Sequence, residues 1–349
     1  MNLEQRIRAF ADLGQFFQQY LNEQAKDEPQ FNEWHKNLHT AIQKSKAANA
    51  WFTTENIIFA LNSWAEVLTV KQLEQWLKSY SINKVKPKRV AIIMAGNIPL
   101  VGFHDFLSVL ICGHSVLVKQ SSNDQYILPV IADVLTSFNS EFQENIDITS
   151  EKLTNFDAVI ATGSNNTARY FEYYFRDKPS IIRKNRNSVA VLTGNETAEE
   201  LELLSEDIFR YFGLGCRNVS KLFISENYNF DPFFNAVFKW NGIINHHKYA
   251  NNYDYNKAVY LMSEFNILDN GFFMLKEDSN YASPISVAFY EYYNNLEELQ
   301  LKLTSEGDQI QCVVSGASAG IGIAFGSTQQ PKLWDYADNV DSVDFLLKI

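Results

Sequence analysis

The first 85 residues of the chain carry the apolar spacing of helices. In the stretch "IIFALNSWAEVLTVKQLEQWLKSY", Leu61, Trp64, Leu68 and Leu73 recur on one side of a helix. The N-terminal stretch "MNLEQRIRAFADLGQFFQQYL" has the pattern of an amphipathic helix. We therefore expect a helical N-terminal region that contributes little chemistry.

From residue 90 onward, short apolar runs alternate with helical stretches. The run from Val90 to Met94 predicts a buried strand, and "NIPLVGFHDFLSVLICG" predicts a helix with Pro99 near its start and Gly113 at its end. "HSVLVKQ" predicts a second strand, so this part is a βαβ unit. The alternation continues through "QYILPVIADVLTSF", "FDAVIATG", "NTARYFEYYF" and "SVAVLTG". The pattern is typical of a doubly wound α/β domain.

A second α/β region follows the acidic helix predicted at "ETAEELELLSEDIFRYF". Strands are predicted at "KLFIS", "GFFML", "ISVAFY" and "IQCVVS", with helices at "FDPFFNAVFKW" and "NLEELQLKLTS" between them. We expect residues 1–195 to form the helical N-terminus and a cofactor-binding domain, and residues 196–325 a catalytic domain. Residues 326–349 should pack back on the fold or lie at an oligomer interface.

Composition and charge restrict the function classes. Apolar residues make up 46% of the chain, and 30 basic against 41 acidic residues give a net charge of -11. With this excess of acidic residues, a nucleic-acid partner is not expected. The longest apolar stretch is interrupted by His104, Asp105 and His114, and the N-terminus lacks the pattern of a signal peptide. We expect a cytoplasmic protein with no membrane partner.

The three cysteines differ in their surroundings. Their number and spacing fit a reducing compartment and indicate no zinc site. Cys112 and Cys312 lie in apolar runs and are expected in the core. Cys216 follows "GLG", where backbone without side chains gives a ligand access, and the neighbouring Arg217 could favour the thiolate. Cys216 is therefore the candidate nucleophile, with an ordinary loop cysteine as the alternative.

Polar residues follow two of the predicted strands. Asn97 lies where the first strand ends, the position at which open parallel sheets bind ligands, although it could equally be a helix N-cap. Thr162, Gly163 and Ser164 end another strand and could hold a phosphate at a helix N-terminus, or Ser164 or Asn165 could simply cap that helix. No G-x-G-x-x-G fingerprint follows any predicted strand.

The order of these features resembles the aldehyde dehydrogenase superfamily over residues 85–349. The resemblance implies roles for Asn97 as the oxyanion asparagine, Lys119 as a cofactor-ribose lysine, Gly163 and Ser164 as the phosphate-side loop, and Cys216 as the nucleophile. The short chain and the C-terminal "DYADNVDSVDFLL" look most like the acyl-CoA reductase family, which includes the fatty acyl reductase of bacterial luminescence. A homo-oligomer and an acyl-CoA substrate are also implied.

Two departures from the superfamily pattern affect the expected reaction. The segment "IIRKNRNSVAV" holds no carboxylate where the general-base glutamate would lie, so hydrolysis of a thioester is not favoured. In "EDSNYASPISV" the cofactor-ribose glutamate is missing, and Asp278 and Asn280 are the candidates. The expected activity is NAD(P)H-dependent reduction of an acyl-CoA. The alternatives are a reductase of an acyl phosphate or other activated acid, and a catalytically silent cofactor-binding homologue.

The segment "KQSS" bears on the choice of cofactor. Lys119, Ser121 and Ser122 are the expected contacts near the adenosine ribose. In relatives that prefer NAD, a glutamate three positions after the lysine accepts from the ribose hydroxyls, and here that position is Ser122. A serine does not repel a 2′-phosphate and can donate to it. NADPH is the expected cofactor, with NADH as the alternative.

Overall fold

The chain folds into two α/β units in the computed structural model, which describes residues 1–82 and 85–349. Unit 1 comprises Met1–Lys184 and Lys332–Ile349, and unit 2 comprises Asn185–Pro331. The α/β class expected from the sequence is confirmed. Within the described residues, no helix combines the length and apolar character needed to cross a bilayer.

Unit 1 is built on a five-stranded sheet with the order β3-β2-β1-β4-β5, in which every pair of neighbours is parallel. The order reverses at β1, because the chain goes on to β2 and β3 on one side and to β4 and β5 on the other. A reversal of this kind is the topological switch point at which open parallel sheets bind ligands. The strands are β1 (Arg89–Ile93), β2 (Ser115–Lys119), β3 (Ile146–Thr149), β4 (Ala158–Thr162) and β5 (Ser180–Arg183).

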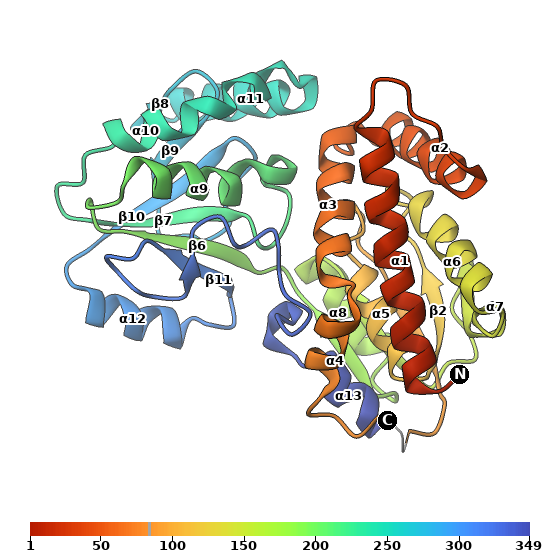
Figure 1. Ribbon diagram of the computed structural model, residues 1–349. Coiled ribbons are helices and arrows are strands. Elements are labelled where there is room, and N and C mark those ends of the chain that lie inside the picture. The colour runs from red at the N-terminus through yellow and green to blue at the C-terminus, as the bar shows by residue number, and fades with distance from the viewer. Residues whose placement is uncertain (83–84) are drawn as a thin grey trace. The chain divides into compact units, whose positions relative to one another are not determined.

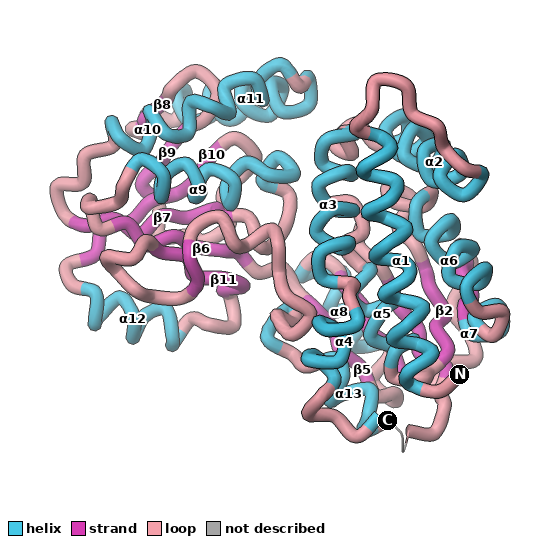
Figure 2. The backbone as a smooth tube through the Cα atoms, in the orientation of Figure 1, coloured by secondary structure: helices cyan, strands magenta, loops and turns pink. Residues whose placement is uncertain are grey.

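Most of unit 1 outside the sheet is helical (Figure 2). One continuous periodic stretch in the sequence divides into two helices, because Thr69 caps the second with its hydroxyl, which accepts from the Gln72 N–H at 3.2 Å. The helices are α1 (Leu3–Gln24), α2 (Glu33–Ala48), α3 (Thr54–Val67), α4 (Val70–Leu77), α5 (Phe103–Ile111), α6 (Ile127–Phe138), α7 (Phe142–Asn145), α8 (Asn165–Tyr174) and α13 (Ser342–Lys348), with a short 3₁₀ turn η4 (Ala337–Asn339).

Alternate residues of β1 contribute to different cores. Val90 and Ile92 belong to the large core that includes residues of α1, α5 and α6, whereas Ala91 packs in a smaller core with Phe171 of α8 and the adjacent Phe175. This follows from strand geometry, in which successive side chains point to opposite faces. The N-terminal helices extend the large core, and α1 and α3 run side by side (Figure 1).

Unit 2 is built on a seven-stranded sheet with the order β12-β11-β6-β7-β10-β9-β8. Its neighbours are parallel, except for the antiparallel pair of β8 and β9. The strands are β6 (Asn187–Leu192), β7 (Val219–Ser225), β8 (Ile267–Asp269), β9 (Met274–Glu277), β10 (Val287–Tyr293), β11 (Ile310–Ser315) and β12 (Ile323–Ala324).

The strand β6 corrects one detail of the sequence interpretation. We expected this strand to complete the sheet of the first domain, but it pairs with β7 and β11 in the second sheet. It starts a new βαβ unit with β7, and its Val189 and Val191 pack in a core with Leu299 and Leu303. The chain therefore passes from one unit to the other between Lys184 and Asn185, earlier than the expected boundary.

The helices of unit 2 lie on both faces of its sheet, with α9 and α12 on opposite faces (Figure 1). A capping box at Thr197 and Glu200 starts α9, as the acidic first turn predicts. The helical segments are α9 (Ala198–Phe209), the 3₁₀ turn η2 (Arg210–Gly213), α10 (Asp231–Val237), the 3₁₀ segment η3 (Phe238–Asn245), α11 (His247–Met262) and α12 (Leu296–Ser305).

The C-terminal segment returns to unit 1, where α13 packs against α5. The buried His114 ring joins the two parts of this unit: Nδ1 accepts from the Lys88 N–H at 3.0 Å, and Nε2 donates to the Leu346 carbonyl at 2.9 Å. These two contacts require the neutral ring with its proton on Nε2. Burial lowers the pKa of His114, which favours the same neutral form.

Candidate active site

The loop that follows β1 carries Asn97 and is not the start of a helix. The expected helix begins only at Phe103, and its N-cap is Gly102. The interpretation of Asn97 as a helix cap is therefore wrong, because it lies five positions before the N-cap residue. Asn97 is exposed at the carboxyl edge of the sheet, next to the switch point.

This loop rests on the loop that follows β2. Leu100 has a left-handed backbone with φ of 57° and donates its N–H to Oδ2 of Asp124 at 3.1 Å. A Cβ on Gly96 would lie 2.5 Å from the Ser121 hydroxyl oxygen, so only glycine permits this close approach. Burial raises the pKa of Asp124 to about 6, against the lowering effect of the Leu100 hydrogen bond. The position of Asn97 thus depends on contacts between two strand-end loops.

The three candidate residues of "KQSS" have different environments. Lys119 ends β2 directly opposite Ile93 of β1, so it lies at the same carboxyl edge as Asn97. The Ser121 hydroxyl accepts from the Asn123 N–H at 3.3 Å and packs against Gly96. Ser122 is exposed. The structure gives Ser121 a role within the loop, whereas the cofactor contacts of Lys119 and Ser122 remain predictions.

The residues at the end of β4 form the start of α8. Thr162 is the last residue of the strand, and Gly163 donates its N–H to the Arg183 carbonyl at 3.3 Å. Ser164 is the N-cap, with its hydroxyl accepting from the Thr167 N–H at 3.3 Å, so the capping alternative is confirmed for this residue. A Cβ on Gly163 would lie 3.0 Å from Thr167, so glycine lets α8 approach the strand end.

The segment that lacks the family glutamate contains a buried ion pair instead. Arg183, the last residue of β5, binds Asp105 of α5 with both terminal nitrogens of its guanidinium, one of them at 2.8 Å. The same guanidinium donates to the Ser342 hydroxyl at 3.2 Å. Arg183 and Asp105 are both buried, so the carboxylate that lies here neutralises an arginine.

Cys216 lies in a turn between η2 and β7. The backbone leaves α9 through Tyr211, Phe212 and Gly213, whose φ angles of 56°, 59° and 74° are all left-handed. Cys216 is exposed, whereas Cys112 and Cys312 are buried as expected. Burial raises the pKa of Cys112 to about 12, which keeps it a neutral thiol.

The turn that holds Cys216 lies at the amino edge of its sheet. It precedes β7, and Ser188 at the start of the neighbouring β6 donates its hydroxyl to the Cys216 carbonyl at 3.0 Å. Ligands of open parallel sheets normally bind at the carboxyl edge. The candidate nucleophile thus lies at the amino edge of its sheet, opposite to the edge at which ligands normally bind. The candidate residues of unit 1 lie at the carboxyl edge of theirs.

The Arg217 guanidinium donates to the Sγ of Cys312 at 3.3 Å. The sequence did not predict this contact with the buried cysteine of β11. Stabilisation of a Cys216 thiolate by Arg217 remains a prediction.

The segment that should contact the cofactor ribose is held by buried lysines. The Asp278 carboxylate accepts from Lys276 and from the backbone and side chain of Asn280. Lys221 of β7 has no exposed surface and donates to the carbonyls of Asp278 and Ser279 at 3.1 and 2.8 Å. Sequence reasoning missed Lys221, although a lysine inside the apolar run "KLFIS" is a signal that could have found it.

A family model described as acyl-CoA reductase (LuxC) matches residues 3–237. No curated protein sequence matches the chain.

Several solved structures share the fold at low sequence identity. Aldehyde dehydrogenase 21 from Physcomitrella patens, in complex with succinate, is 10% identical with a TM-score of 0.68, covering 100% of this chain and 84% of that one. An NADP-dependent enzyme from E. coli is 10% identical, with a TM-score of 0.61 and coverages of 91% and 77%. The NAD⁺ complex of an aldehyde dehydrogenase from Bacillus cereus is 12% identical, with a TM-score of 0.59 and coverages of 92% and 73%. The chain therefore has the aldehyde dehydrogenase fold.

Proposed function

The chain belongs to the acyl-CoA reductase family, and we propose that it reduces an acyl-CoA thioester to the aldehyde through a covalent thioester on Cys216. Family and fold make it an NAD(P)-dependent oxidoreductase of aldehyde chemistry. The finer proposal names the substrate, the nucleophile and the preferred cofactor, NADPH.

One observation carries the assignment of the nucleophile. Of the three cysteines, only Cys216 is exposed, and it lies in a turn within the residues that the family model matches. Cys112 and Cys312 are buried in unit 1 and unit 2, where an acyl-CoA would have to displace packed side chains to reach them. An exposed thiol in a well-defined turn is the arrangement that covalent catalysis needs.

The carboxyl edge of the unit 1 sheet suits a nicotinamide cofactor. Its strand order reverses beside β1, which is where such sheets bind nucleotides. Lys119 ends β2 and Ser122 follows it at this edge, and they supply a cation and a hydroxyl donor, the groups that a 2′-phosphate would require. We infer that these two residues hold the adenosine ribose and its phosphate. When bound, the cofactor supplies the hydride that reduces the acyl group.

The proposed chemistry of the chain itself centres on one sulfur atom. The Cys216 thiolate attacks the thioester carbonyl, the carbon–sulfur bond to CoA breaks, and CoA leaves as a thiolate. The Asn97 amide and the Cys216 N–H stabilise the oxyanion of the tetrahedral species. After reduction, the carbon–sulfur bond to Cys216 breaks, which releases the aldehyde and restores the thiolate. Acyl-CoA, NADPH and a proton thus become aldehyde, CoA and NADP⁺.

The pairing of the charged groups in unit 1 favours reduction of the Cys216 thioester over its hydrolysis. Hydrolysis of the Cys216 thioester would need a carboxylate that activates water. The carboxylates of Asp105 and Glu172 bind the segment "IIRKNRN", and both are engaged by its cations. Asp105 pairs with Arg183, and Glu172 pairs with Lys184 at 2.7 Å. A reductase has no activated water to make, and its leaving thiol, with a pKa of about 8.5, departs as the anion.

An absorbance assay of NADPH and NADH oxidation against acyl-CoAs of increasing chain length tests the proposal. It should be combined with intact mass spectrometry, in which acyl-CoA without cofactor adds one acyl group at Cys216. Faster turnover with acyl phosphates would favour that alternative substrate class. Absence of both cofactor oxidation and acyl-enzyme would contradict the proposal and favour the silent homologue.

A further inference from the structure

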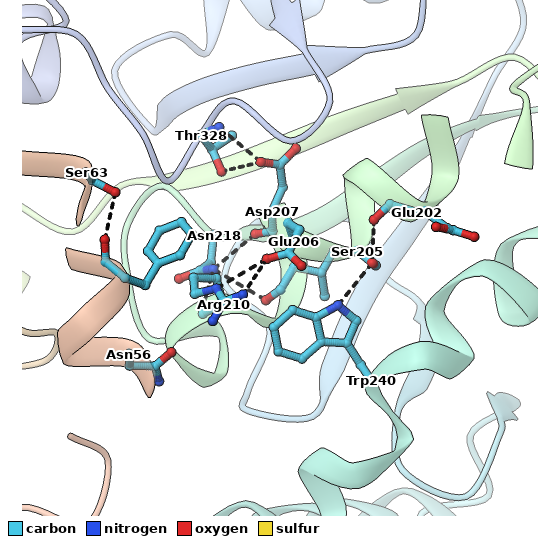
Figure 3. Close-up of polar contacts among 12 residues, drawn as sticks. Asn56, Ser63, Glu202, Ser205, Glu206, Asp207, Arg210, Asn218, Trp240 and Thr328 are labelled. Carbon is cyan, nitrogen blue, oxygen red and sulfur yellow. Dashed lines mark hydrogen bonds and ion pairs between the residues drawn. The ribbon is translucent and has the colours of Figure 1, made fainter. Parts of the chain in front are cut away.

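The end of α9 is capped by a side chain that lies beyond the cysteine. The last carbonyl groups of a helix have no partners within it. Here the side-chain amide of Asn218 donates to the carbonyls of Asp207 and Arg210 at 3.0 and 2.8 Å, with a longer contact to Ile208 at 3.4 Å. Asn218 is only 3% exposed. Figure 3 shows it beside the last turn of α9.

The other end of the same amide binds the turn that holds Cys216. Oδ1 of Asn218 accepts the Gly215 N–H at 2.8 Å, and the backbone N–H of Asn218 donates to the Gly215 carbonyl at 3.0 Å. The turn of residues 215–218 is therefore closed by one backbone and one side-chain hydrogen bond. A single amide joins the helix end to the residue that immediately precedes the nucleophile.

The backbone spanned by this amide is strained. Tyr211 and Phe212 have left-handed φ angles of 56° and 59°, which cost non-glycine residues on the order of 1–3 kcal/mol each. Such a conformation persists only where the surrounding contacts fix it. Asn218 contributes contacts at both ends of the strained segment, at Arg210 and at Gly215.

The charged groups near this amide have partners of their own (Figure 3). The Asp207 carboxylate accepts from Gly326 and from the backbone and hydroxyl of Thr328, at 2.7 to 3.0 Å. The Arg210 guanidinium binds Glu206 at 2.7 Å and lies 5.0 Å from the centre of the Trp240 ring. The Asn218 side chain is thus bound by backbone groups, which are three carbonyls and one N–H.

We propose that Asn218 is a positioning residue for acyl transfer, which sets the Cys216 peptide and thiol at the geometry that the tetrahedral species requires. The inference rests on the proposed role of Cys216 as nucleophile. A displacement of about 1 Å in a catalytic group can cost about a hundredfold in rate, and the chain on both sides of Cys216 depends on this amide.

The test compares two reactions of the same sulfur in Asn218→Ala. Acylation by acyl-CoA, followed in single turnover, needs the correct geometry around the carbonyl, whereas alkylation by iodoacetamide needs only a reachable thiolate. Acylation should fall about a hundredfold, and alkylation should stay within about threefold of the wild-type rate. Ser205→Ala is the matched control. It removes the hydroxyl that binds Trp240 at 3.1 Å from the same helix, without touching the turn, and should leave both rates near wild type.

A second variant, Asn218→Asp, makes the effect depend on pH. Its protonated carboxyl group has the shape of the amide, with a hydroxyl donor for the helix carbonyls and an acceptor for Gly215. Its ionised form would face three carbonyl oxygens. The ratio of acylation to alkylation cancels the thiolate fraction, so it should approach wild type in acid and fall as pH rises. The wild-type ratio should not change with pH.

Each outcome has a distinct meaning. A wild-type protein that is alkylated but never acylated removes the proposed function, whatever Asn218 does. A wild-type protein that is acylated, together with an Asn218→Ala variant acylated equally fast, overturns the inference and leaves the function intact. Failure of both Asn218 variants to fold would also overturn it, because Asn218 would then act only in the fold.

Discussion

The backbone N–H of Leu100 lies 3.1 Å from Oδ2 of Asp124, and this contact joins the loop after β1 to the loop after β2. Asn97 is carried by the first loop, Lys119 is the last residue of β2 before the second loop, and Ser122 lies in the second loop. The residues proposed for the oxyanion and for the cofactor ribose are therefore parts of one packed loop pair. A change in one loop should affect the function of the other.

Replacing Asn97 should separate catalysis from stability. Because Asn97 caps no helix and is exposed, Asn97→Ala should change the melting temperature no more than an ordinary surface substitution does. Loss of an oxyanion donor should lower kcat by about a hundredfold or more. Asn22→Ala, an exposed change in α1 outside both loops, is the control and should retain wild-type kcat. Wild-type turnover by Asn97→Ala would show that the oxyanion donor lies elsewhere.

Replacing each cysteine in turn should separate the catalytic role proposed for Cys216 from the structural roles of Cys112 and Cys312. Cys216→Ala should form no acyl-enzyme in intact mass spectra and show no turnover, while cofactor still binds. Cys112→Ala and Cys312→Ala remove buried atoms and should lower the melting temperature without changing acylation. Acyl-enzyme on the Cys216→Ala protein would assign the nucleophile to another residue.

The charge at position 122 should control cofactor choice. Ser122→Glu places a carboxylate where the 2′-phosphate is proposed to lie, so the Michaelis constant for NADPH should rise by at least about tenfold and that for NADH much less. Ser140→Glu, an exposed change at the opposite edge of the sheet, controls for added charge. Equal effects of Ser122→Glu on the two cofactors would place the phosphate elsewhere.

Removing one partner of the buried pair of Arg183 and Asp105 should destabilise unit 1 more than replacing both partners with apolar residues. Arg183→Met leaves a buried carboxylate without its partner and should lower the unfolding free energy of unit 1 by about 3–5 kcal/mol. Combining it with Asp105→Leu should recover much of that loss. Lys348→Met removes an exposed pair with Asp344 and should cost about 1 kcal/mol or less. Urea denaturation measures all three, and a double variant as unstable as Arg183→Met would contradict the prediction.

His114 should make unit 1 less stable in mild acid. Its pKa in the folded state is lowered by burial, with smaller effects from Leu346, Arg6, Asp157 and Lys88. The unfolded chain therefore binds the proton more readily, and stability is lost as pH falls below about 6.5. The melting temperature of His114→Gln should fall less between pH 7 and pH 5 than that of wild type. The exposed control His247→Gln should behave like wild type, and identical slopes in all three would exclude His114 as the cause.

Apolar runs predicted the strands of this fold better than its connections. The runs that became β1, β2 and β4 are buried on both faces and stand out in sequence. The helix α11 was not predicted, because its buried residues are only Tyr249, Tyr253 and Asn256 and no apolar stripe marks it. The pairing of β6 with the second sheet could not be predicted either, since a buried strand has the same apolar sequence pattern in any parallel sheet.

A candidate site residue could be predicted where its sequence surroundings differed from those of other residues of the same type. Cys216 stood out because the other two cysteines lie in apolar runs, and it is the exposed one. Asn218 did not stand out in the sequence, because its role depends on helix carbonyls that only the fold brings close to it. The pairing of Arg183 with Asp105 joins residues 78 positions apart, and no local pattern marks such a contact.

Unit 2 is inserted into unit 1, and this arrangement has a consequence for biosynthesis. All of Asn185–Pro331 leaves the ribosome before the segment Lys332–Ile349 that completes unit 1. Until then, Arg183 lacks its contact with Ser342 and His114 lacks its contact with Leu346. The half of the protein that is made first is therefore the half that finishes folding last, and a nascent chain stalled before residue 332 should expose the surface of α5 to chaperones.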